Sequence, residues 1–145
     1  MGQPTPSGTW LYAPPMPLDA SPHSLAAAAI RILFWWTVLS PLGLLAVAVL
    51  CASRPRLRAA LTLVVLVPPF LVLLPVAVMH GGFAGAVAAG AALLVAAGVV
   101  LCAAALVHAR RRPELAARNA AAALVFGVVG GMLGSGALVA ALIFA

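Results

Sequence analysis

Three histidines have the widest ligand chemistry in this sequence, and their positions keep them apart. His23 precedes the first long apolar run, His80 lies in a short turn between two runs, and His108 follows the third run. Haem or metal binding needs such side chains in facing positions, and most metal sites add a carboxylate or a cysteine. His80 and His108 are separated by one whole apolar run and so fall at its opposite ends. We therefore predict no metal ion and no cofactor.

Nucleophilic, redox and proton-transfer chemistry has no better support in the sequence. Cys51 and Cys102 lack Cys-x-x-Cys spacing, so we interpret them as small apolar packing residues. Hydroxyl side chains such as Ser40 occur singly, without a base and an orienting partner. Asp19 and Glu114 are the two carboxylates, and both lie outside the apolar runs, which disfavours a proton-coupled antiporter. We predict no catalytic residues and no enzymatic activity in the chain itself.

The composition indicates a membrane protein. The 145 residues are 66% apolar and 7% charged, and the mean hydropathy is +1.22. A soluble domain is nearer half apolar and a quarter charged, so this chain has too little polar surface to cover a water-exposed globule. The net charge of +6 comes from arginines gathered in short clusters between apolar runs, and this pattern excludes nucleic acid as a partner. Abundant Ala, Gly, Pro and Arg without Lys favours a bacterium with GC-rich coding.

Four apolar stretches are long enough to cross a membrane. At 1.5 Å per helical residue, each covers about 30 Å or more, the thickness of the hydrocarbon core. We therefore predict an all-α integral membrane protein with four transmembrane helices in an up-down bundle, preceded by an extended Pro-rich N-terminal tail. The predicted tail is residues 1–24, the membrane domain is residues 25–145, and the spans are residues 32–51, 59–79, 83–107 and 120–144.

Arginines between the spans set the predicted orientation. The two Arg-bearing connections share one side of the membrane, because two spans separate them, and the positive-inside rule places that side in the cytoplasm. The tail, the His80 turn and the C-terminus then face outward, with Arg31 near the outer interface. We predict a multi-pass protein of the bacterial inner membrane whose cytoplasmic loops contact anionic lipids. The arginines of these loops are Arg54, Arg56, Arg58, Arg110, Arg111, Arg112 and Arg118.

Prolines and small residues inside the spans predict bends and close helix packing. Pro41 in the first span, and Pro68, Pro69 and Pro75 in the second, each remove a backbone donor, so we expect kinks near them. We interpret the bends as structural, because no charged residue accompanies them at mid-membrane depth. Small residues four apart form a groove that admits a neighbouring helix. The predicted helix-packing interface consists of Gly81, Gly85, Ala89, Gly90, Gly127, Gly131 and Ser135.

The first 24 residues differ from the rest of the chain. Six prolines interleaved with apolar side chains predict an extended, polyproline-like segment. Two placements remain open: the tail lies on its own bundle or on lipid headgroups, or it docks on a partner subunit, since a stiff segment loses little entropy on binding. The residues predicted to dock are Trp10, Leu11, Tyr12 and Met16.

Two functions fit these observations. The first is a non-catalytic accessory or assembly subunit of a larger membrane protein complex, with a bacterial respiratory or other energy-converting complex as the expected host. Its partners would be other membrane protein subunits, contacted through packed helices and the N-terminal tail. The alternative is a homo-oligomeric small channel or transporter, suggested by the kinked second span and by glycines suited to a pore lining. Unrelated neighbours in the native particle would favour the first, and identical copies the second.

Overall fold

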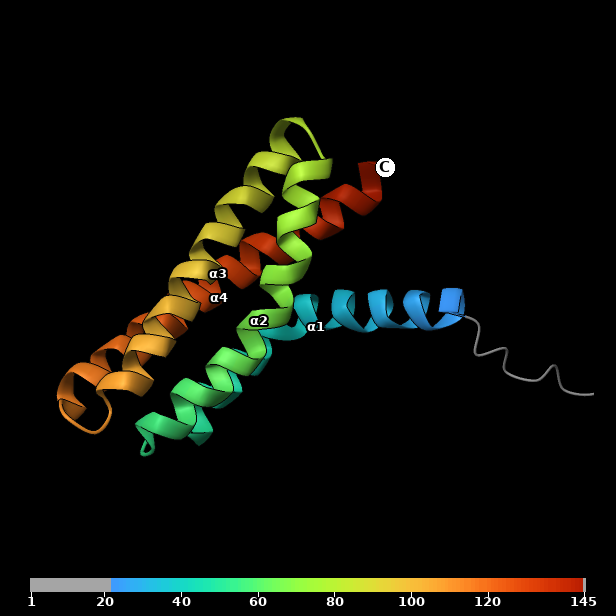
Figure 1. Ribbon diagram of the computed structural model, residues 1–145. Helices are drawn as coiled ribbons and strands as arrows, with labels where there is room; N and C mark the ends of the chain where they lie inside the picture. Colours follow the sequence, from blue (N-terminus) through green and yellow to red (C-terminus); the bar gives the residue numbers. More distant parts are fainter. Residues whose placement is uncertain (1–21, 145) are drawn as a thin grey trace, which may run out of the picture.

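The computed structural model describes residues 22–144, and this part of the chain folds into four long helices (Figure 1). Each helix is long and apolar enough to cross a membrane. The prediction of an all-α, four-helix, multi-pass membrane protein is therefore confirmed. The helices are α1 (Pro22–Leu50), α2 (Pro55–Met79), α3 (Gly82–His108) and α4 (Pro113–Phe144).

The helices extend beyond the apolar runs that predicted them. α1 begins at Pro22, inside the stretch assigned to the tail, and continues to Leu50. Pro55 and Pro113 open α2 and α4. A proline at the first helical position loses no helical hydrogen bond and already has the required φ, so it favours a helix start there. As a result Arg56 and Arg58 lie on α2 and Arg118 lies on α4, and the two connections shrink to residues 51–54 and 109–112.

The four helices follow an up-down order. α4 has its most extensive interface with α3, α2 packs on α3, and α1 contacts α2 and α4. Both Arg-bearing connections, residues 51–54 and 109–112, lie at one end of the bundle. The turn at His80 and the end of α4 lie at the other end (Figure 1). Gly82 begins α3 with φ +73°, a backbone conformation that favours glycine.

Three leucines fill the centre of the bundle by entering hollows on α4. Leu44, Leu66 and Leu73 are fully buried. A Cβ atom at Gly127 would lie 2.9 Å from Cδ2 of Leu66 and 3.0 Å from Cδ1 of Leu44, and one at Gly134 would lie 2.8 Å from Cδ1 of Leu73. The glycines therefore provide the space that the leucines occupy, and α4 packs closely against α1 and α2.

Gly130 sets the spacing between α4 and α3. A Cβ atom there would lie 3.0 Å from Cβ of Leu94, 3.0 Å from Cγ2 of Val95 and 3.2 Å from the carbonyl oxygen of Ala91. Cβ of Leu94 and the Ala91 oxygen are fixed by the α3 backbone, so they cannot rotate away. A side chain at residue 130 would push the two helices apart.

α1 bends sharply and leaves the bundle. Its C-terminal part runs beside α2, whereas its N-terminal part departs to one side (Figure 1). We call residues 22–36 the divergent segment; residues 23–32 are all exposed. Pro41 is buried at the bend, with its Cγ 3.1 Å from the position of a Cβ atom at Gly131. Residues 23–32 of α1 thus have no packing face on the described bundle.

Replacing Gly130 with leucine should destabilise the bundle by about 1–3 kcal/mol, because the new side chain overpacks the contact between α3 and α4. The free energy of unfolding in SDS–detergent mixed micelles measures the effect. Gly136→Leu is the matched control, since Gly136 lies on the same helix and no atom is within 4 Å of its Cβ position. Equal loss of stability in both variants would contradict this role of Gly130.

Candidate functional site

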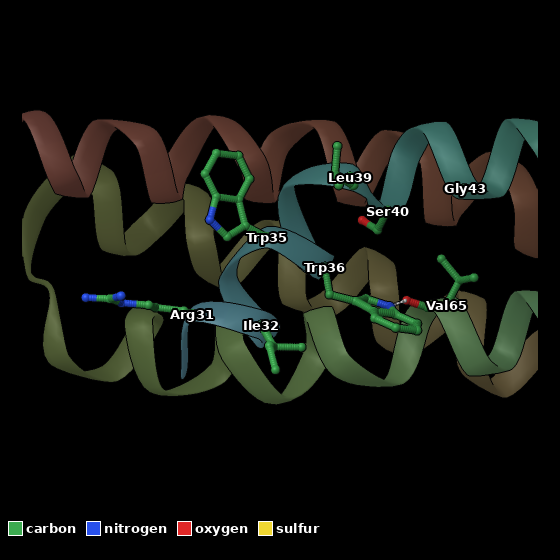
Figure 2. A pocket seen from close by; sticks show the side chains of 8 residues that line it. All are labelled: Arg31, Ile32, Trp35, Trp36, Leu39, Ser40, Gly43 and Val65. Carbon is green, nitrogen blue, oxygen red and sulfur yellow. Dashed lines mark hydrogen bonds between the residues drawn. The ribbon is translucent and has the colours of Figure 1, made fainter. Parts of the chain in front are cut away.

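A groove opens where the divergent segment separates from α2. Seven of its lining residues come from α1, and they recur at alternating steps of one and three, which places them on one face of the helix. The groove has a volume of ≈ 590 Å³. Figure 2 shows its lining residues: Arg31, Ile32, Trp35, Trp36, Leu39, Ser40, Gly43 and Val65.

The two ends of the groove differ in chemistry. Arg31 is exposed at one end and is the one lining residue with a formal charge. At the other end α1 and α2 converge, because a Cβ atom at Gly43 would lie 3.7 Å from Cγ1 of Val65. Between these ends the walls are apolar side chains, among them Ile32 and Leu39. The groove therefore has a cationic mouth, an apolar length and a closed end.

Trp36 links α1 to a backbone carbonyl that proline has freed in α2. Pro69 has no N–H group, so the carbonyl of Val65, four residues earlier, loses its usual helical partner. The indole Nε1 of Trp36 donates to this carbonyl over 3.4 Å (Figure 2). In lipid an unsatisfied backbone carbonyl costs several kcal/mol. This hydrogen bond thus places the Trp36 ring across the groove.

The carbonyl freed at the bend of α1 also accepts a hydrogen bond from a side chain. Pro41 frees the carbonyl of Thr37, and the Oγ of Ser40 donates to it over 2.8 Å. The Oγ of Ser135 on α4 lies 3.3 Å from the same carbonyl and 3.5 Å from that of Val38. It also lies 2.7 Å from the Gly131 carbonyl of its own helix. The opened turn of α1 therefore faces hydroxyl groups from two helices.

The predicted packing residues of α4 lie where that helix meets α1 and α2. Gly127 and Gly131 are buried. Gly127 faces Leu44 and Leu66, and Gly131 faces the Pro41 ring. Ser135 is half-buried and touches the bend of α1. Gly130 and Gly134, beside the predicted set, make the closest approaches described above.

The predicted packing residues of α3 lie elsewhere. Gly81, Ala89 and Gly90 are exposed, and no atom lies within 4 Å of a Cβ position at Gly81 or Gly90. Gly85 is buried, but a Cβ atom there would overlap the carbonyl oxygen of His80, so it serves the turn. Small residues occur all around α3, so spacing alone does not select its inner face. The buried residues of α3 are Gly85, Ala88, Ala91, Ala92, Val95, Gly98, Cys102 and Ala105.

The charged and titratable side chains form no common site in the described part of the chain. No cluster of three or more His, Cys, Asp or Glu residues occurs in residues 22–144. His108 Nδ1 lies 2.8 Å from the Ala104 carbonyl of its own helix, and Cys51 and Cys102 are buried free thiols. The predicted loop arginines are exposed except Arg58, which is half-buried with an unpartnered Nε. The tail residues Trp10, Leu11, Tyr12 and Met16 lie outside the described residues.

The groove was not predicted from the sequence, although part of its signal was present. Counting four residues back from Pro41 and Pro69 identifies the freed carbonyls of Thr37 and Val65. Nothing in the sequence pairs Trp36 with Val65, because that contact depends on the direction in which α1 leaves its bend.

Replacing Pro41 with alanine should restore the N–H donor and straighten α1 toward the bundle. Spin labels at Leu25 and Leu142, both exposed, report the change as a shorter distance in pulsed electron resonance. Pro75→Ala in α2 is the matched control and should leave this distance unchanged. An unaltered distance in Pro41→Ala would show that packing at Gly131, and not the missing donor, holds the bend.

Comparison with known proteins adds no functional assignment: no family model matches the chain, and no curated protein or solved structure matches it either.

Proposed function

We propose that the protein is a non-catalytic accessory or assembly subunit of a larger membrane complex, and that it docks on a neighbouring subunit through the divergent segment. The observation that carries this proposal is the exposure of every residue from 23 to 32, on all sides of a long apolar helix. A helix that belongs to a bundle buries at least one face. This one leaves its bundle, although its sequence continues to suit a membrane interior.

The small residues of the divergent segment support a protein neighbour. Helices gain little from hydrophobicity inside a bilayer, and they associate through close packing. The side of the divergent segment away from the groove carries Ala26, Ala27 and Ile30. Two alanines beside one exposed branched side chain provide a shallow hollow and a projecting contact for another helix. The proposed docking face is this side of the segment.

The outer surface of α3 supports a second contact of the same kind. Ala89 and Gly90 are exposed there, and Gly90 has open space at its Cβ position. Such a surface lets another backbone approach closely. A subunit with close-packing surfaces on opposite helices suits a position between neighbours within a larger assembly.

The alternative of a channel would require several copies. Leu44, Leu66, Leu73 and Val95 are fully buried and fill the interior of the described bundle. A conducting path would therefore have to form between chains. We favour the accessory subunit, because residues 22–144 place no charged side chain among the buried residues.

Native isolation in mild detergent tests the proposal. A photoreactive residue at Ile30 should cross-link a partner protein, whereas the same residue at Leu50, exposed at the arginine end of α1, should not. Mass spectrometry of the product identifies the partner. A stoichiometric unrelated subunit supports the proposal, and identical copies would favour the channel. A protein that runs alone and yields no cross-linked partner would contradict both.

We further propose that the Arg-bearing connections lie in the cytoplasm of a bacterium and the His80 turn outside its inner membrane. Seven arginines at one end of the bundle support this orientation. In a background lacking Cys51 and Cys102, Gly81→Cys should react with a membrane-impermeant maleimide on intact cells. Arg111→Cys should react only after the membrane is opened. The reverse pattern would contradict the orientation.

A further inference from the structure

We propose that the groove between α1 and α2 binds an anionic phospholipid, with the phosphate at Arg31 and one acyl chain along the groove toward Gly43. This binding site is independent of the docking function proposed above. The groove is complementary to such a molecule, because its mouth is cationic and the rest of its lining carries no charge. Its exposed walls are mainly apolar, with Trp36 and Leu39 along the length.

The dimensions of the groove suit one leaflet of a bilayer. Arg31 and Gly43 are twelve residues apart on one helix, which is about 18 Å along its axis. One leaflet contributes about 15 Å of hydrocarbon. An acyl chain whose phosphate lies at Arg31 therefore reaches the closed end, where α1 meets Val65.

The depth of Arg31 creates a need for a counter-ion. Pro41 packs against Gly131, which lies next to the midpoint of the apolar stretch 120–144, so the bend is near the middle of the membrane. Arg31 precedes Pro41 by ten residues, which is about 15 Å of helix. Because the divergent segment inclines away from the bundle (Figure 1), Arg31 lies at a smaller height than this length. Its Cα is therefore within the hydrocarbon layer, where an unpaired charge is costly.

Residues 22–144 offer no carboxylate side chain near this charge. Glu114 is the one carboxylate side chain in residues 22–144, and it opens α4 at the opposite end of the bundle. Asp19 precedes the described residues. Phosphate is the anion that the membrane itself supplies, and an arginine fork binds two of its oxygens at once. The snorkelling side chain of Arg31 thus meets a lipid phosphate at the upper edge of the groove.

Quenching of Trp36 fluorescence by brominated lipid tests this site. The purified full-length chain, with Trp10→Phe and Trp35→Phe, is reconstituted in phosphatidylcholine vesicles. A small fraction of either phosphatidylglycerol or phosphatidylcholine then carries the brominated chains. We expect brominated phosphatidylglycerol to quench Trp36 at about fivefold lower mole fraction, the selectivity that one cation contributes beside an anionic headgroup. Equal quenching by the two lipids would overturn the proposal.

Matched variants separate this site from the general lipid annulus. Arg31→Gln should abolish the preference, Arg31→Lys should keep most of it, and Asp19→Asn and Arg118→Gln should leave it intact. In a chain whose three native tryptophans are phenylalanine, Phe83→Trp places a reporter on a residue that is 86% exposed near the His80 turn. This reporter should show no preference. A preference that persists in Arg31→Gln, or that appears equally at residue 83, would overturn the proposal.

Discussion

Backbone carbonyls inside a membrane need donors from the protein, and this constraint shapes the joint between α1 and α2. Lipid tails cannot donate to a carbonyl at mid-membrane depth, so a carbonyl freed by an internal proline needs a side chain, an ordered water or a local change in helix geometry to satisfy it. Ser40 meets this need for Thr37 at the bend of α1. Trp36 meets it for Val65 across the groove. The hydrogen bond of Trp36 therefore joins α1 to α2 near the prolines that interrupt both helices.

The bend does not loosen the bundle, because α4 packs closely against it. Pro41 presents its ring to Gly131, and Ser135, one helical turn further along α4, approaches the opened carbonyls of α1. Glycines at 127 and 134 receive Leu66 and Leu73 on either side of this contact. Close packing supplies the attraction that hydrophobicity does not supply in lipid, so α4 holds the bent helix in one position.

The sequence predicted the parts of this structure that depend on composition and length. Four apolar runs were enough to predict four membrane-crossing helices, because only helices satisfy the backbone of such runs in lipid. The inner face of α3 was not predictable in this way, because Ala and Gly occur on every side and several faces fit the same four-residue spacing. The groove depends on the direction of α1 after Pro41, which the contacts at Gly131 and Ser135 determine. Those contacts join residues far apart in the chain.

The bend at Pro41 also changes the depth of Arg31 in the membrane, and with it the role of that charge. On a straight α1, Arg31 would lie ten residues above the bend along the membrane normal, at the headgroups, where it would act as a simple anchor. The inclination of the divergent segment lowers its backbone into the hydrocarbon and turns one apolar face of the helix toward α2. A cation at that depth requires an anion, and the groove beside it has room for an acyl chain. An anionic phospholipid supplies a net negative charge and an acyl chain in one molecule, whereas the phosphate of a zwitterionic lipid is paired with its own ammonium group and a free phosphate has no acyl chain.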